Sequence, residues 1–144
     1  MRSIEEGYAG GRLKPDFVTY ARAGMDHFNR REFWEAHEAW ETIWLVAESD
    51  VEQFLQGLIQ IAAAYHHVQR GTYRGAGRLF DAGLKRLEPY PTSFCGIDRD
   101  AAEKAARRHR AWLSAADGSP SEPLSPDEYP KLLARDIAPP SLQW

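Results

Sequence analysis

Residues 28 to 44, FNRREFWEAHEAWETIW, have the periodicity of one amphipathic helix. At 100° per residue, Trp34 and Leu45 lie on a separate face beyond His37 and Glu41, whereas six other apolar side chains share one face about 100° wide. They are Phe33, Ala36, Trp40, Ile43, Trp44 and Ala47. A stripe of this kind is typical of a helix that packs against the core of a globular domain, so we expect a helix here.

Residues that start and stop helices divide the rest of the chain. Pro15-Asp16 and Asp98 are typical of helix starts, Ser49-Asp50 indicates a third cap, and Gly71 is typical of a helix end. Pro89 and Pro91 prevent a helix from continuing past Glu88. We therefore expect helices at about residues 16–29, 32–48, 51–70, 72–88 and 99–115, with one more helical turn near residues 131–135. No segment alternates with a period of two, so the predicted fold class is all-α.

The predicted helices form a repeat with an offset of 40 residues. Ala36 aligns with Ala76, and Trp40 aligns with Phe80. This favours two stacked helix hairpins plus a fifth helix, although any two amphipathic hairpins align in a similar way. We expect one domain over residues 1–144, with a flexible arm at 1–15, a helical bundle at 16–116 and a proline-rich arm at 117–144. The last arm is expected to dock on the bundle through Leu142 and Trp144.

Composition limits the classes of function. A net charge of −3 and a pI near 5.9 argue against a general nucleic-acid binder. The longest apolar run, residues 54–65, is too short and too polar to span a membrane, and the amino terminus lacks the apolar core of a secretory signal. With one cysteine, Cys95, a disulfide within the chain is impossible. We therefore expect a soluble cytoplasmic protein.

Six polar residues on two predicted helices are the candidate site. His37, Glu38 and Glu41 lie on the first helix, and Gln56, Gln60 and His66 lie on the next one. One interpretation is a buried hydrogen-bonded network that fixes how the helices pack. The other is a site for a divalent metal or a small polar ligand, with His37 and Glu41 as metal ligands, in the manner of a His-Glu-x-x-His helix whose second histidine is glutamate. That alternative extends to a metal-dependent hydrolase.

A pattern of polar, aromatic and small residues in this region resembles that of a known family. They are Phe33, Glu35, His37, Glu38, Glu41, Trp44, the stretch Gln56 to Gln60, Gly71, Gly75 and Ala76. The pattern covers about residues 25–88 and closely resembles the bacterial and archaeal family catalogued as domain of unknown function number 309. The resemblance implies a compact helical bundle and leaves its biochemical role open.

Charge is unevenly distributed along the chain. Residues 32–52 carry seven acids and no Lys or Arg, whereas residues 70–110 carry ten Lys or Arg against five acids. The two surfaces are expected to pair within one chain or between two copies in a homodimer. RNA on the basic side is the competing interpretation, which the absence of an aromatic stacking platform disfavours. His27 and His109 are expected on the surface in water, and Cys95 has no base beside it in sequence to activate it.

These observations favour a non-enzymatic module that binds a partner or itself, in which the six polar residues form a structural network. The alternative is a ligand site at His37 and Glu41, and the sequence leaves open whether the protein is an enzyme.

Overall fold

The structure is a computed structural model that describes residues 14–140 and 144. Its elements, in chain order, are α1 (Phe17–Asn29), α2 (Phe33–Trp44), α3 (Ser49–Arg70), α4 (Tyr73–Leu87), β1 (Ser93–Phe94), β2 (Ile97–Asp98), α5 (Asp100–Ala115), a 3₁₀ turn (Pro126–Glu128) and β3 (Leu133–Ala134). The all-α fold class is confirmed, and the expected flexible arm at residues 1–15 lies almost wholly outside the described residues.

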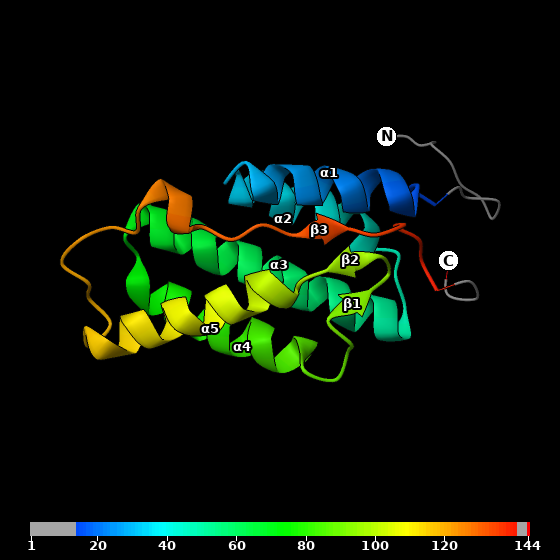
Figure 1. Cartoon of the computed structure of the whole chain (residues 1–144). Helices are drawn as coiled ribbons and strands as arrows, with labels where there is room; N and C mark the ends of the chain where they lie inside the picture. The colour runs from blue at the N-terminus through cyan, green and yellow to red at the C-terminus, as the bar shows by residue number, and fades with distance from the viewer. Residues whose placement is uncertain (1–13, 141–143) are drawn as a thin grey trace.

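The helices form the two hairpins that the repeat predicts. α1 packs on α2, α2 packs on α3, and α3 packs on α4. α5 lies against α4, and the C-terminal segment then runs back across the bundle between α1 and α5 (Figure 1). The aligned alanines Ala36 and Ala76 are both fully buried, as expected where two helices approach closely. α3 therefore lies between an α1–α2 side and an α4–α5 side.

α3 is the central helix, because half of its 22 residues are buried. Gly57 of α3 and Gly83 of α4 face each other, which brings the two backbones close together. A Cβ on Gly83 would lie 3.1 Å from the Gly57 carbonyl oxygen and 2.8 Å from Ile61 Cδ1. The short distance between the α3 and α4 backbones therefore depends on glycine at both positions.

The helix ends agree with the predicted punctuation in some places and depart from it in others. Asp16 caps α1 by accepting from the Thr19 N–H at 2.9 Å, and Gly71 ends α3 with a left-handed φ of 74°. The predicted second helix was too long, since α2 ends at Trp44 instead of Glu48. Ser49 adopts a φ of 53° in the turn into α3, and no side chain caps that helix, so the predicted Ser49-Asp50 cap is wrong.

The C-terminal arm docks on the bundle, as expected, but its secondary structure differs from the prediction. The helical turn predicted near residues 131–135 is instead β3, which pairs with β2, because the chain here is extended along α1. The Asn29 side chain binds the arm through two hydrogen bonds. It donates to the Leu132 carbonyl at 2.9 Å and accepts from the Leu132 N–H at 2.7 Å. Leu124, Leu132 and Ile137 are its buried anchors.

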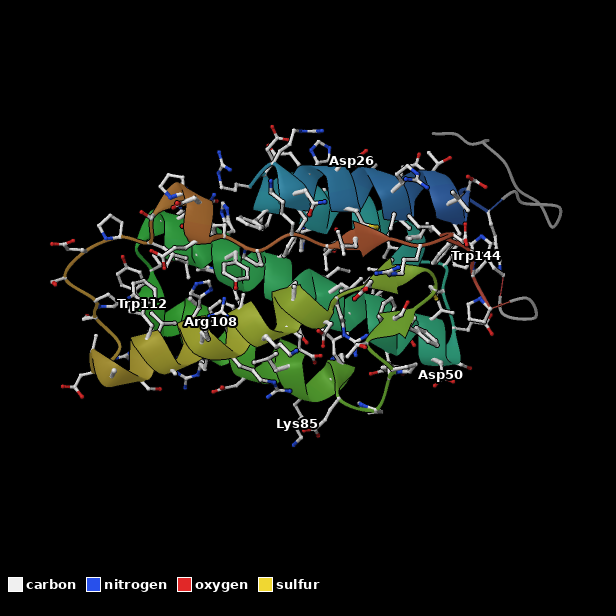
Figure 2. The ribbon with its side chains drawn as sticks, in the orientation of Figure 1. Asp26, Asp50, Lys85, Arg108, Trp112 and Trp144 are labelled. Atoms are coloured by element: carbon white, nitrogen blue, oxygen red, sulfur yellow. The ribbon has the colours of Figure 1, made fainter. Side chains whose placement is uncertain are left out.

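The chain end also contacts α1, through Trp144. Its ring meets Phe17 edge to face at 5.2 Å, and Lys14 Nζ lies 5.1 Å from the ring centre (Figure 2). The other predicted anchor, Leu142, lies outside the described residues.

The two tryptophans of the core face should differ in their contribution to stability. Trp40 is fully buried, packs on Phe28 and donates to the Ala21 carbonyl at 3.2 Å, whereas Trp44 is half-buried. Trp40→Ala should lower the free energy of unfolding by about 3–5 kcal/mol, and Trp44→Ala by clearly less. Urea denaturation of both variants measures this, and equal losses would contradict the packing described here.

Candidate functional site

A stack of aromatic and imidazole rings lies where the start of α2 meets the end of α3. Trp34 and His37 are one turn apart on α2, and their rings are stacked with centroids 4.5 Å apart and planes at 16°. The ring of His66, from α3, lies 5.2 Å from that of Trp34. Trp34 is 44% exposed, so much of its ring is open to a partner.

An open groove of about 570 Å³ runs beside this stack. Trp34, His66 and Phe33 provide its aromatic surface, and charged side chains from both helices and the preceding loop surround it; these are Arg31, Glu32, Glu35 and Arg70. Burial, with smaller contributions from His67 and Arg70, lowers the pKa of His66, although Glu35 opposes the shift. His66 is therefore neutral near pH 7.

The structure brings together only two of the six predicted site residues, His37 and His66. The predicted hydrogen-bonded network is wrong, because Gln60 faces α4 and accepts from Arg86 Nε at 3.2 Å. Gln53 accepts from Arg86 as well. Across the described residues, the side chains of Glu38, Glu41 and Gln56 make no hydrogen bond to protein. Two glutamines of α3, Gln53 and Gln60, therefore bond to one long cationic side chain on α4, which the α2–α3 pairing alone does not indicate.

His37 has an unusual environment for a polar side chain. Its Nδ1 is buried and has no hydrogen-bond partner in the described part of the chain. In residues 14–140 and 144 no group of three or more His, Cys, Asp or Glu side chains is arranged to hold a metal ion. Metal binding by His37 and Glu41, which would be two ligands of a larger set, therefore stays a prediction.

The residues around this groove lie within a segment that matches the model of a protein family. The model of a domain of unknown function, DUF309, matches residues 21–79. This is the DUF309 segment. The match confirms the resemblance predicted from the sequence, and it covers most of α1, all of α2 and α3, and the first half of α4. No curated protein matches the chain. No helix in the described residues has the length and apolar character needed to cross a membrane.

Arg99 lies outside the DUF309 segment. It is one of the ten Lys and Arg residues that were expected to form the basic surface, and that expectation is wrong for Arg99. It is only 2% exposed and donates to the carbonyls of Leu87, Tyr90 and Pro91 at 2.6–2.9 Å. The Leu87 carbonyl lies at the end of α4, and the other two lie in the following loop, where Pro89 and Pro91 prevent the helix from continuing. The only hint in the sequence is that a helix cut short by two prolines leaves carbonyls that need donors.

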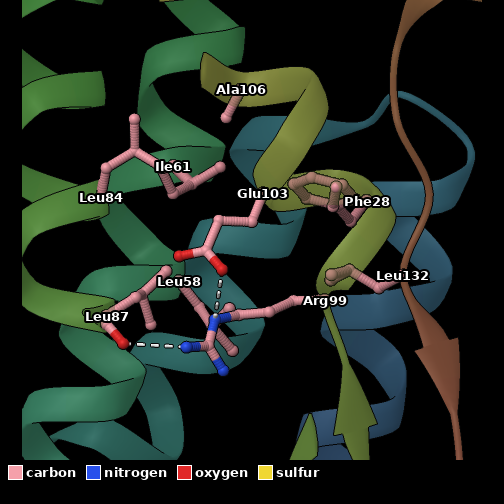
Figure 3. Close-up of a pocket in the computed structure, with 10 residues that line it drawn as sticks. Phe28, Leu58, Ile61, Leu84, Leu87, Arg99, Glu103, Ala106 and Leu132 are labelled. Atoms are coloured by element: carbon pink, nitrogen blue, oxygen red, sulfur yellow. Dashed lines mark hydrogen bonds and ion pairs between the residues drawn. The ribbon is translucent and has the colours of Figure 1, made fainter. Parts of the chain in front are cut away.

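Arg99 also borders a narrow apolar crevice between α3, α4 and α5 that Leu132 of the arm helps to line (Figure 3). Its Nε lies 3.9 Å from a carboxylate oxygen of Glu103 and has no hydrogen-bond partner in the described region. Burial lowers the pKa of Arg99, and Glu103 opposes that shift. The hydrogen bonds of Arg99 to the Leu87 and Tyr90 carbonyls hold the start of α5 against the end of α4, and its pair with Glu103, one turn along α5, is structural.

The two histidines expected in water are both engaged with other residues. His109 is 5% exposed and its Nδ1 lies 2.7 Å from the Tyr65 hydroxyl, so the prediction for His109 is wrong. His27 Nδ1 lies 2.7 Å from a carboxylate oxygen of Glu32 on the surface. Burial lowers the pKa of His109 to about 4 and raises that of Tyr65. The Tyr65 hydroxyl therefore stays protonated, and it donates a hydrogen bond to Nδ1 of the neutral His109 imidazole.

The buried His109 should make stability depend on pH. The unfolded chain takes up a proton near pH 6.5, whereas the folded chain does so only near pH 4. The contribution of His109 to the free energy of unfolding should therefore be largest above pH 7. It should fall by up to about 3 kcal/mol as the pH drops toward 4. Urea denaturation across this range should show a shallower loss in His109→Gln, which keeps an acceptor for Tyr65. His27→Gln, on the surface, serves as the control, and an unchanged pH profile in His109→Gln would contradict the assignment.

His37 should respond to substitution according to its stack and its unpaired nitrogen. His37→Phe keeps a ring against Trp34 and removes a buried atom without a partner, so it should raise the free energy of unfolding by about 1 kcal/mol. His37→Ala loses the stack and should lower it by about 0.5–1.5 kcal/mol. Melting both variants with and without divalent metals measures this. Stabilisation of the natural protein by one metal, lost in both variants, would instead support the ligand role.

Proposed function

We propose that this protein is a non-enzymatic binding module that associates with a second copy of itself through the outer face of α2. The observation that carries the proposal is a set of apolar and acidic side chains on the outer face of that helix. Trp34 and Leu45 are exposed there, and Glu38 and Glu41 form no ion pair in the described part of the chain. None of the side chains that line the neighbouring groove is a serine, threonine, cysteine or lysine nucleophile. The groove thus favours binding over covalent chemistry.

The α2 face consists of Trp34, Glu38, Glu41 and Leu45. Helical geometry places all four within about 60° of one another. Trp34 is 44% exposed and Leu45 is 70% exposed, which makes them two of the three exposed large apolar side chains in the described residues. Tryptophan is enriched among the residues that contribute most to binding at protein interfaces. An exposed tryptophan and leucine on one helix face therefore support a docking role.

The acidic residues of the α2 face support a basic partner. Among residues 14–140 and 144, neither Glu38 nor Glu41 forms an ion pair. Lys85 and Arg108, on α4 and α5, also lack a carboxylate partner within the described chain. Both side chains are exposed on the α4–α5 side, whereas α2 lies on the other side of α3 (Figures 1 and 2). This separation by α3 supports pairing of these charges between two copies of the chain.

The positions of the two surfaces determine the kind of assembly. A two-fold dimer through the α2 face alone would place glutamates opposite glutamates. The α2 face of one copy against the basic side of another is a head-to-tail contact, which extends unless the copies close into a ring. We propose this association for the cytoplasm. Cys95, the one cysteine of the sequence, has its pKa raised to about 12 by burial and forms no disulfide in the chain.

Reciprocal charge reversal tests the proposal. Glu38→Lys/Glu41→Lys and Lys85→Glu/Arg108→Glu should each lower the association measured by sedimentation velocity at about 0.05 M salt. Mixing the two variants should restore it, because the reversed faces are complementary again. Trp34→Ala should weaken association of the natural protein without changing its charge.

The matched control is Glu48→Lys, which reverses an acid beyond the end of α2 and away from Trp34. Association that rises with salt, or a mixture no more associated than its components, would contradict the proposed contact. A natural protein that stays monomeric at low salt would do the same.

A further inference from the structure

A second cleft lies on the α4–α5 side of the molecule, where the start of α4 meets the end of α5. Its volume is about 510 Å³, which is in the range of small-molecule sites. Three arginines line it, Arg74 and Arg78 from α4 and Arg110 from α5, together with the hydroxyl-bearing Ser114 and Ser119. The lining thus provides cationic groups and small hydrogen-bonding groups from two elements and the loop that follows α5.

Arg110 is held in a defined orientation at the wall of the cleft. Its Nε and Nη2 donate to the two carboxylate oxygens of Asp81 at 2.7 and 3.0 Å, and its Nη1 donates to Ser114 Oγ at 3.0 Å. Hydrogen bonding to Asp81 raises the pKa of Arg110. The guanidinium lies against Gly77, where a Cβ would be 3.4 Å from Nη1. Because Asp81 and Ser114 already hold the guanidinium, it loses little further conformational entropy when it contacts a ligand.

Arg74 and Arg78 differ from Arg110 because no carboxylate of the described residues pairs with them. They are one turn apart on α4, so their side chains project from the same side of the helix. Asp117, at the rim, is the acidic residue of the lining and opposes an anion there. With Asp81 engaged by Arg110, the cleft keeps two uncompensated arginines against one carboxylate.

We propose that this cleft binds the phosphate group of a phosphorylated small molecule. Arginine pairs bind phosphate through parallel charge-assisted hydrogen bonds, and the serine hydroxyls offer further donors. Tyr73 and Leu113 form the apolar part of the lining, which would receive the body of the molecule. A long polynucleotide fits less well, because single-strand binding uses a row of aromatic platforms and the lining has one aromatic residue.

This inference goes beyond the proposed self-association and uses different residues. The charge changes that test the α2 face leave Arg74, Arg78 and Arg110 untouched. Phosphate binding is therefore measured both in the natural protein and in Glu38→Lys/Glu41→Lys. Failure of the α2 contact and failure of the cleft thus give separate results.

Isothermal titration calorimetry with inorganic phosphate and with phenyl phosphate tests the proposal. Both should bind with one site per chain, and phenyl phosphate should bind more tightly because its ring adds apolar contact. Arg74→Gln/Arg78→Gln should weaken binding by about tenfold or more. Asp117→Asn should strengthen it several-fold, since it removes the opposing charge and asparagine tolerates the φ of 53° at this position.

Lys131→Gln is the control, because it removes an exposed cation outside both the cleft and the proposed self-association contact, and it should change the affinity less than twofold. An equal loss in Lys131→Gln and Arg78→Gln would show attraction by overall charge and overturn the site. Absence of saturable binding by either phosphate would also overturn it. A single-stranded oligonucleotide that binds more tightly than phenyl phosphate, with a steep dependence on salt, would identify a polyanion surface instead. Circular dichroism of each variant confirms that the fold is retained.

Discussion

The close packing of α3 against its neighbours is the constraint on which the rest of this structure depends. α3 buries side chains toward both α2 and α4, and Gly57 and Gly83 let two backbones approach where any side chain would collide. Once α3 lies in the centre, α1–α2 and α4–α5 must lie on opposite sides of it (Figure 1). Burial of this one helix therefore determines which surfaces of the protein remain available to partners.

The separation of the two sides explains the charge pattern of the chain. α3 lies between the acidic residues of α2 and the basic residues of α4 and α5, and in the described part of the chain no ion pair joins the two groups. Where charges are buried, they are used inside the fold instead. Arg99 donates to the carbonyls at the end of α4 and lies beside Glu103, one turn along α5, at the crevice that Leu132 helps to line. The same residue type is thus structural in one place and available for binding in another, according to its depth.

The two proposed surfaces differ in how they relate to the DUF309 segment. The α2 face and its ring stack lie wholly inside residues 21–79. The phosphate cleft lies across its boundary, because Arg74 and Arg78 belong to the segment and Arg110, Ser114 and Ser119 come from α5 and the loop after it. α5 and the C-terminal arm therefore complete a cleft that the helix hairpins alone do not form.

The sequence by itself determined the helices and much of their pairing, because hydrophobic periodicity and helix punctuation are local properties. It placed Trp40, Ala36 and Ala76 in the core, identified the family segment, and brought attention to His37 and His66. Only the tertiary structure decided which polar groups meet. Gln60 pairs with Arg86 and His109 with Tyr65 across 26 and 44 residues, and no local pattern encodes such partners. The short sheet escaped prediction for the same reason, since two-residue strands have no periodicity and form only when the docked arm brings β3 to β2.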